Sequence, residues 1–404
     1  MSTTVRLREV GSTYGGLTGK TKADFGRGDA QFVTFLEVIQ STRLVGRSLE
    51  QVQVKEGERQ NIVKRGDVLF NGSSEIPEEV ALSAVVDFDP KISTFLNSFC
   101  FGFRLRPDAT VDPTYLAYFF RSSAGRSLVS SLAQGATRYN IAKTKFLDVE
   151  LALPSIERQR EIVEWLNDAD DLIATLERLI AKKQAIKQGI MQQLLTGRTR
   201  LPGFSSDWDL TKLGTVASMN SGGTPASSVA KHYGGGIPWV SISDMTRSGK
   251  YIAKTEKTLT EEGLASSAAR LYEPDVVLYA MYASLGECSL AVGRVASSQA
   301  ILGIETGPRL FPEFLYYWLQ YLKPKVRLLG QQGTQANLNA GMVRDFVLKL
   351  PQVEEQKAIA TALADADAEV SSLMRRLEKA RAIKTGMMQQ LLTGCTRLPA
   401  EAVS

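Results

Sequence analysis

Residues 153–202 of the chain read LPSIERQREIVEWLNDADDLIATLERLIAKKQAIKQGIMQQLLTGRTRLP, and residues 350–399 read LPQVEEQKAIATALADADAEVSSLMRRLEKARAIKTGMMQQLLTGCTRLP. The two stretches align without a gap, and about half of their positions are identical. A repeat separated by roughly 200 residues is too long for a solenoid, whose units run to about 20 to 50 residues. The chain is therefore a tandem of two units, each made of one variable module and one repeated stretch.

Each repeated stretch predicts a long amphipathic helix. Pro154 and Pro351 suit a helix start, whereas Gly197 and Gly394 are typical of a helix end. A helix from about Leu166 would be roughly 45 Å long at 1.5 Å per residue. An Asp-x-Asp motif is shared by both copies and suggests a break between a short first helix and a long second one; it comprises Asp168 and Asp170 in the first copy and Asp365 and Asp367 in the second.

Apolar residues recur at heptad spacing along both copies, and this pattern predicts an antiparallel coiled coil within one chain. The alternative is that each helix packs only against its own module. A flanking column widens the stripe of the first copy beyond what one partner helix would cover; it comprises Trp165, Leu172, Leu179 and Ile186. The positions that we assign to helix pairing and to docking of a further subunit are Leu166, Ile173, Leu176, Ile180, Leu194, Leu363, Val370, Leu373, Leu377 and Leu391.

Composition narrows the class of protein. The 404 residues are 44% hydrophobic, enough for several cores, and two to four domains are expected. No apolar run reaches the length of a membrane span, and three scattered cysteines form no disulfide framework, so we expect a cytoplasmic protein with no membrane contact. The net charge of +5 includes no basic tail and would not by itself suggest nucleic acid.

The modules between the repeats predict an α+β fold. Residues 1–150 alternate short β-rich runs with turns, at residues 31–38, 67–70, 80–88 and 99–106, before a helix that begins at Pro113. Residues 205–347 repeat this order with looser sequence, and each module ends on a Thr-x-x-Asn segment, followed by Phe146 or Phe346 on a strand that leads into the helix. We predict two pseudo-symmetric α/β modules separated by the two long helices, divided as residues 1–152, 153–200, 201–349 and 350–404.

Four motifs that resemble catalytic sites have simpler interpretations. Gly15 to Thr21 looks like a phosphate loop, but the first glycine of that motif is replaced by Tyr14. Asp112-Pro-Thr-Tyr resembles the tetrapeptide of amino-methyltransferases, yet it also fits a helix N-cap. Asp275 could open a nuclease core, although no Glu-x-Lys follows it. His232, as the sole histidine, supports neither a zinc site nor a Ser/His/Asp relay. We expect a chain without catalytic residues, cofactor or metal.

The architecture of the whole chain resembles the specificity subunit of type I restriction-modification systems. The resemblance rests on two diverged modules, on helices that begin Leu-Pro-x-x-x-x-Gln and end Gln-Gln-Leu-Leu-Thr-Gly, and on the lead-in Arg-Leu-Pro-Gly-Phe204. The first module lacks this lead-in, which the C-terminal Arg-Leu-Pro399 would supply if the two ends lie together. The resemblance implies two target-recognition domains, each reading half of a bipartite DNA sequence. It also implies that the helices hold two modification (methyltransferase) subunits, with the restriction/translocase subunits joining through the complex.

Loop residues of the two modules are the candidates for contacts with double-stranded DNA. Arginine pairs with guanine and asparagine or glutamine with adenine in the major groove, whereas lysine neutralises phosphates. The candidates are Lys20, Lys22, Arg27, Arg138, Asn140, Lys231, Tyr233, Gln335 and Asn337. Each asparagine could instead cap its own turn, and Lys20, Lys22 and Arg27 could be a solvated loop. An alternative function is a fused DNA methyltransferase-like enzyme with a cryptic cofactor site. The target bases and the exact gap do not follow from the sequence.

Overall fold

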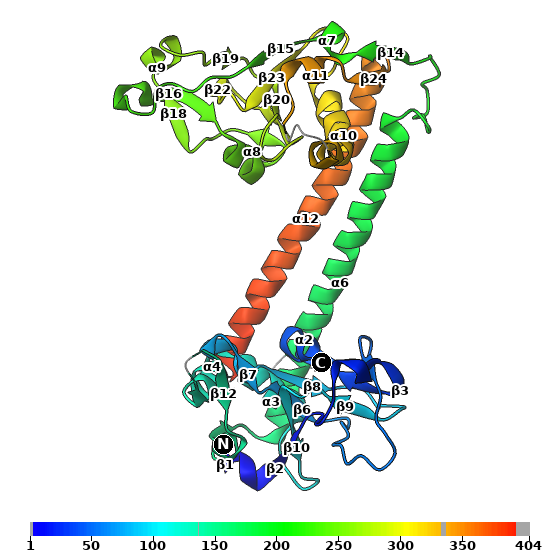
Figure 1. Ribbon diagram of the computed structural model, residues 1–404, viewed down its shortest axis with the longest axis vertical. Coiled ribbons are helices and arrows are strands. Elements are labelled where there is room, and N and C mark those ends of the chain that lie inside the picture. Colours follow the sequence, from blue (N-terminus) through cyan, green and yellow to red (C-terminus); the bar gives the residue numbers. More distant parts are fainter. Residues whose placement is uncertain (1–2, 136, 333–336, 393–404) are drawn as a thin grey trace, which may run out of the picture. The chain divides into compact units, whose positions relative to one another are not determined.

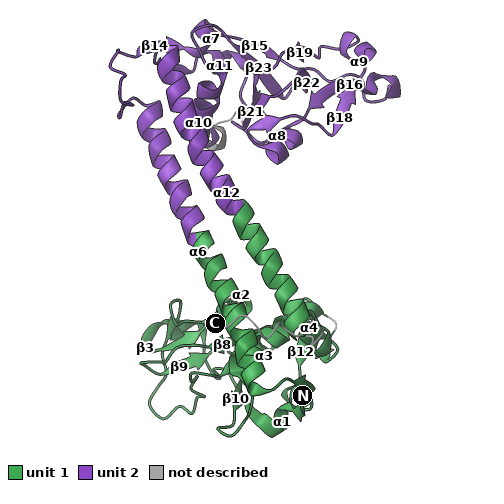
Figure 2. Cartoon of the chain, turned by 180° about the vertical axis from the view of Figure 1, so that it is seen from behind, with its two compact units in different colours: residues 1–177, 375–404 green, residues 178–374 purple. Residues whose placement is uncertain are grey.

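The computed structural model describes residues 3–135, 137–332 and 337–392. These residues form two compact units (Figure 2). Unit 1 comprises residues 1–177 and 375–404, and unit 2 comprises residues 178–374. Each unit therefore combines one module with about half of each of the two long helices, which are α6 (Ile156–Leu195) and α12 (Val353–Leu392). Nowhere among the described residues is a helix both long and apolar enough to cross a membrane.

The module of unit 1 is built on a five-stranded sheet with the strand order β2-β10-β6-β8-β4 (Figure 1). Its strands and helices are β1 (Thr3–Arg6), α1 (Leu7–Val10), β2 (Gly11–Gly15), η1 (Lys22–Asp24), β3 (Phe25–Val33), α2 (Phe35–Gln40), β4 (Arg43–Leu44), β5 (Glu50–Val52), β6 (Val68–Asn71), β7 (Ser73–Ser74), η2 (Pro77–Glu79), β8 (Ser83–Val86), β9 (Thr94–Leu96), β10 (Cys100–Leu105), α3 (Pro113–Arg121), α4 (Ser123–Ser130), β11 (Ala133–Gln134), β12 (Tyr139–Ile141), α5 (Lys143–Leu147) and β13 (Glu150–Leu153).

The module of unit 2 repeats this topology, with a five-stranded sheet of order β15-β23-β20-β21-β17. Its elements are β14 (Asp209–Lys212), α7 (Leu213–Val216), β15 (Ala217–Ser221), η3 (Ala230–His232), β16 (Tyr233–Val240), α8 (Ile242–Ser248), β17 (Tyr251–Ile252), β18 (Lys257–Leu259), α9 (Glu261–Ala265), β19 (Leu271–Tyr272), β20 (Val277–Ala280), β21 (Cys288–Ala291), β22 (Val295–Ser297), β23 (Ile301–Thr306), α10 (Pro312–Gln332), α11 (Ala340–Arg344) and β24 (Val347–Leu350). The expected α+β fold with two pseudo-symmetric modules is confirmed.

The strand before each long helix pairs with the first strand of its module. β13 pairs antiparallel with β1, and β24 pairs antiparallel with β14. Within each unit, helix ends complete the core of the module. Leu166 and Leu391 belong to the apolar core of unit 1, and Leu194 and Leu363 belong to that of unit 2. The repeated helices are therefore part of each module's fold as well as partners of each other.

Segments of α6 and α12 run antiparallel in both units. In unit 1, Lys384 pairs with Asp170 and Arg381 pairs with Glu177. In unit 2, Lys183 pairs with Glu369 and Lys187 pairs with Asp367. The partner number falls as the α6 number rises, as antiparallel pairing requires. Eight of the ten stripe positions are buried, and Ile173 and Leu377 are partly exposed. The flanking residues Trp165, Leu172 and Ile186 are exposed.

The glutamine of the repeated Leu-Pro-x-x-x-x-Gln motif ties each long helix to its module. The buried Gln356 side chain accepts a hydrogen bond from the Phe311 amide (2.7 Å) and donates to the carbonyl groups of Arg309 and Pro351 (both 2.8 Å). Gln159 makes the same bonds in unit 1, to Asp112 and Pro154, with a longer one to the Thr110 carbonyl (3.4 Å). The motif is retained in both copies because its amide satisfies buried backbone groups.

The lead-in to the second module is held by a buried carboxylate. Arg200 makes two bonds to Glu355, at 2.6 and 2.7 Å, and the Trp208 indole donates to the same carboxylate at 3.0 Å. Glu355 is buried at the start of α12. The two parallel bonds of the Arg200–Glu355 ion pair therefore fix the position of the lead-in relative to this helix. The C-terminal Arg-Leu-Pro399, expected to play this part for the first module, lies outside the described residues.

Several expectations about local structure were wrong. α6 begins at Ile156, close to the expected start at Pro154, but it has no break near the Asp-x-Asp motif, because Asp170 lies inside it. Residues 31–38 do not form one strand, because Thr34 accepts a hydrogen bond from the Glu37 amide and caps helix α2. Phe146 lies in α5 rather than on a strand. The helix from Pro113 is interrupted at Ser122, whose hydroxyl oxygen caps α4.

Candidate nucleic-acid interface

The Thr-x-x-Asn segment of unit 1 leads into β12, a short strand that begins at Tyr139. β12 pairs with β11 and with β7, and in the second pair Asn140 lies opposite Ser73. Side chains alternate between the two faces of a strand, so Ile141 is buried while Asn140 is exposed. The Asn140 amide donates to the Arg138 carbonyl at 3.2 Å, as expected for a residue that caps its own turn.

Arg138 lies over an exposed aromatic ring from a distant turn. Its guanidinium carbon is 5.8 Å from the centre of the Phe99 ring, and Phe99 is 56% exposed. The turn is held tightly, because the Phe99 amide donates to the Asn97 side chain and the Phe99 carbonyl accepts from Gly72. The Gly72 carbonyl in turn accepts from the Ile141 amide. We call Phe99, Arg138 and Asn140 the unit 1 edge site.

Unit 2 has the same backbone connection with different side chains. The Leu338 amide donates to the Met281 carbonyl at 3.0 Å, as Ile141 does to Gly72 in unit 1. This bond brings together the segments that carry Asn337, which is exposed, and Tyr282, which is 40% exposed. The residue after Tyr282, Ala283, has a positive φ of 52°, a strained conformation that is often found at functional loops. We call Tyr282 and Asn337 the unit 2 edge site. Gln335 lies outside the described residues.

Sequence reasoning missed Phe99 and Tyr282. Each is an aromatic residue close to turn-forming residues, Asn97 and Ser98 in one module and Ser284 in the other. An aromatic side chain within a turn is a weak signal, because most such residues fold back onto the core. The fractional exposure of the two rings is what distinguishes them, and exposure is a tertiary property.

The three basic residues of the Gly-rich loop have different environments. The Lys20 side chain is only 5% exposed, and its ammonium group pairs with Glu58 and donates to the Gln53 carbonyl at 2.7 Å. The bond from Lys20 lowers the pKa of the Glu58 carboxyl. Lys20 is thus used inside the module. Lys22, in η1, and Arg27, in β3, are exposed.

The two candidates near the start of β16 are engaged with their own module. Lys231 forms an ion pair with Glu262, and both side chains are largely exposed. The Tyr233 hydroxyl donates to the Pro225 carbonyl at 2.7 Å, and its ring meets Trp239 edge-on at 6.4 Å. Tyr233 is half-buried and packs within its own module, where β16 pairs antiparallel with β18.

Two acidic residues of unit 1 have structural partners. The Asp112 carboxylate accepts from the amides of Thr114 (2.8 Å) and Tyr115 (3.0 Å) and so caps α3, which confirms the simpler interpretation of the methyltransferase-like tetrapeptide. Asp67, which corresponds to Asp275 of the other module, is buried. Its carboxylate accepts two hydrogen bonds from Arg104 and one from Tyr14. Burial and the Asp67 charge raise the pKa of the Tyr14 hydroxyl. These carboxylates stabilise the fold.

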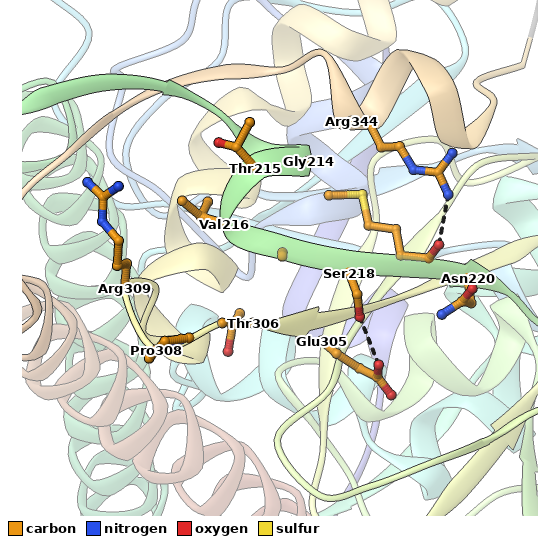
Figure 3. Close-up of a pocket in the computed structure, with 13 residues that line it drawn as sticks. Gly214, Thr215, Val216, Ser218, Asn220, Glu305, Thr306, Pro308, Arg309 and Arg344 are labelled. Carbon is orange, nitrogen blue, oxygen red and sulfur yellow. Dashed lines mark hydrogen bonds between the residues drawn. The ribbon is translucent and has the colours of Figure 1, made fainter.

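A pocket of about 790 Å³ lies between β15, the β23–α10 loop and α11 of unit 2 (Figure 3). Its charged groups are already paired. Arg344 donates to the Met219 carbonyl at 3.0 Å, Arg309 pairs with Asp209 at 2.6 Å, and Glu305 accepts from the Ser218 hydroxyl at 2.9 Å. The pocket therefore offers a ligand few free polar groups, and it is a weaker candidate than the edge sites.

Comparison with known proteins gives consistent matches over most of the chain. A family model described as "Type I restriction modification DNA specificity domain" matches residues 2–188 and again residues 205–380. Two relatives from Methanocaldococcus jannaschii are assigned as specificity subunits of type I restriction enzymes. The MjaX protein is 25% identical over 82% of this chain and 79% of its own length, and the MjaVIII protein is 24% identical over 71% of each.

A solved structure has the same fold. The S subunit of a type I restriction-modification system from M. genitalium superposes with a TM-score of 0.59 at 13% identity, covering 97% of this chain and 96% of that one. At this level of identity, the likeness concerns the fold and carries no information about individual residues.

Proposed function

The chain belongs to the type I restriction-modification DNA specificity family, and on that premise we propose that each of its two modules reads one half of a bipartite DNA sequence through its edge site. As a specificity subunit, the chain is a non-catalytic DNA-recognition component. The observation that carries the proposal is the repeated backbone connection, Ile141 to Gly72 and Leu338 to Met281, which presents different side chains in the two modules. One scaffold with two surfaces suits the reading of two different half-sites.

The chemistry of the edge sites matches direct readout of bases. In unit 1, Arg138 can donate two hydrogen bonds to guanine and Asn140 can pair with adenine. Phe99 can contact a thymine methyl group beside them. In unit 2, Asn337 supplies the amide and Tyr282 supplies an aromatic face with a hydroxyl group. Each good bidentate contact between a side chain and a base is worth about 1 to 3 kcal/mol against the wrong base.

Contacts with phosphates come from exposed basic residues elsewhere on the modules. We assign this part to Lys22 and Arg27 in unit 1, and leave out Lys20 because its ammonium group is buried and paired. Lys231 of unit 2 is exposed and could exchange its Glu262 partner for a phosphate, whereas Tyr233 has a supporting role. Phosphate contacts of this type add affinity that falls with salt and carry no sequence information.

The long helices serve the rest of the complex in this proposal. The exposed column Trp165, Leu172 and Ile186 gives α6 an apolar surface that a further subunit can cover. We assign that surface to the docking of two modification subunits, through which the restriction subunits join, and we place the complex in the cytoplasm. The division into residues 1–152, 153–200, 201–349 and 350–404 remains our functional division of the chain, with the helices setting the distance between half-sites.

The test is to alter one edge site and sequence the methylated sites of the assembled complex. Replacing Arg138 and Asn140 with alanine should relax the bases of one half-site and leave the other unchanged. Replacing Tyr282 and Asn337 should affect only the other half. Gln192→Ala, on the exposed face of α6, is the control. Unchanged preferences in both double variants would show that the reading surface lies elsewhere on the modules.

A further inference from the structure

Asp170 joins three elements of unit 1. It lies on α6, and its Oδ2 atom accepts a hydrogen bond from the Tyr118 hydroxyl of α3 at 2.7 Å. Its Oδ1 atom pairs with the Lys384 ammonium group of α12. The same ammonium group lies 5.5 Å from the centre of the Tyr118 ring. Tyr118 is fully buried, and the Asp170 and Lys384 side chains are about three-quarters buried. One carboxylate therefore links the module to both helices.

Unit 2 contains the same tyrosine, aspartate and lysine contacts with the helices exchanged, and there Lys250 also donates to the tyrosine hydroxyl at 3.1 Å. Here the carboxylate is Asp367 on α12, which accepts from the Tyr317 hydroxyl of α10 at 2.8 Å and pairs with Lys187 on α6. Tyr317 is fully buried as well. The aspartates and lysines occupy equivalent positions of the two repeats, so each helix contributes one aspartate to one cluster and one lysine to the other. We call these sets the unit 1 clamp (Tyr118, Asp170, Lys384) and the unit 2 clamp (Tyr317, Asp367, Lys187).

The clamps supply directional contacts that the apolar stripe lacks. A heptad stripe packs almost equally well after a slip of whole heptads, whereas a single polar position in a helix pair can specify the register. A slip of one heptad between the helices would move each aspartate by about 10 Å relative to its lysine and break that ion pair. The tyrosine adds a second constraint, since its rigid ring fixes where the module sits along the helix. Burial, with the Asp170 charge next, raises the pKa of the Tyr118 hydroxyl, which keeps it a donor.

We propose that the two clamps make the complex specific for one gap length between the two half-sites. They do so by fixing the register of the two helices and the position of each module along them. This inference rests on the proposed function. It assigns Asp170, Asp367 and their partners as positioning residues that contact no base. Stability alone is a poor reason for such clusters, because replacing a buried ion pair with apolar residues is often neutral or stabilising.

The experiment uses the whole subunit assembled with its modification subunits and a library of DNA sites whose half-sites are constant and whose gap varies. The wild-type complex should methylate one gap length. D170N combined with K384M should raise methylation of the neighbouring gap lengths by about ten-fold relative to the best one, the scale of a lost hydrogen bond to a charged group. The half-site bases should not change. D367N combined with K187M should act in the same way.

Two further variants make the result decisive. E177A combined with R381A removes an exposed ion pair between the same helices that involves no module residue, and the gap preference should be unaffected. Y118F removes only the hydroxyl group and leaves the ion pair between Asp170 and Lys384. It therefore still tests the inference if the double variant fails to assemble. Y118F should also broaden the gap preference. A single, unchanged gap in the assembled clamp variants, or in Y118F, would overturn the inference. A wild-type complex without bipartite preference would instead overturn the proposed function.

Discussion

At the residue scale, the same amino-acid type has opposite roles in different environments. Lys20 and Lys22 lie two positions apart, yet Lys20 is buried in an ion pair with Glu58 and Lys22 is exposed. Gln159 and Gln356 are buried and satisfy backbone groups, whereas Gln192 is exposed on the same type of helix. The cost of removing a side chain follows from these environments, because an unsatisfied buried backbone group is far more costly than a lost contact with water.

Replacing Gln356 with alanine should therefore destabilise unit 2. The substitution leaves the Phe311 amide and the carbonyl groups of Arg309 and Pro351 without this partner. We expect a loss of about 3 kcal/mol in the free energy of unfolding, from two or three unsatisfied groups at about 1 to 3 kcal/mol with partial relaxation. Urea unfolding measures it, and Gln192→Ala should change little. An equal effect of both variants would contradict the structural role of Gln356.

At the element scale, each long helix is one continuous element that is used by two modules. α6 and α12 each span 40 residues without a break, although they contain a shared Asp-x-Asp that suggested one. Aspartate has a low intrinsic preference for helix interiors, but tertiary contacts override such preferences. Asp170 and Asp367 are held in the helix by the clamp contacts, whose partners come from α3 or α10 and from the other long helix.

Inserting one heptad into each helix tests whether the helices set the spacing. Insertions at the matched positions Ala181 and Glu378 keep the apolar stripe in phase and leave every residue pair of both clamps on its own side of the insertion. Each helix lengthens by about 10 Å. At about 3.4 Å per base pair, the preferred gap should grow by two to three base pairs.

The measurement is binding of the assembled methyltransferase to oligonucleotides that differ only in the gap. Affinity should fall even at the new optimum, because the added length also rotates one half-site around the duplex. Far-ultraviolet circular dichroism is the control for intact helices. If the optimum gap stays the same in a folded variant, another element sets the distance.

At the scale of the whole molecule, each unit is assembled from segments that are far apart in the sequence. The core of unit 1 includes Leu391 and Leu392 from the end of α12, and that of unit 2 includes Leu194 and Leu195 from the end of α6. A module therefore folds onto parts of both helices. Its recognition surface can diverge as long as the residues that meet the helices remain compatible with them.

Exchanging residues 205–347 for the corresponding module of a relative should change one half of the recognised sequence and leave the other. The exchange keeps β24 from Leu348 onward and all of α12, so the unit 1 module and its helix contacts are untouched. A donor with tyrosine at the position of Tyr317 preserves the unit 2 clamp. Sequencing of methylated DNA reads the result, with the parental subunit as the control. A change in both half-sites would show that the modules are coupled.

The duplication, the two long helices, their antiparallel pairing and the α+β modules could all be predicted from the order of amino acids, and the motifs of the repeated stretches carried the resemblance to the family. These features depend on repeated sequence motifs and on the periodicity of apolar residues, which can be read from short stretches of a chain. Which candidate residues are available to a ligand depends on the tertiary fold. Lys20 is buried in an ion pair with Glu58, and Phe99 lies beneath the Arg138 guanidinium. The Asp-x-Asp motif, which predicted a helix break, instead supplies the aspartate of a clamp. The contacts that settle those roles join residues from about 40 to more than 200 positions apart, such as Lys384 and Asp170, and no local pattern encodes them.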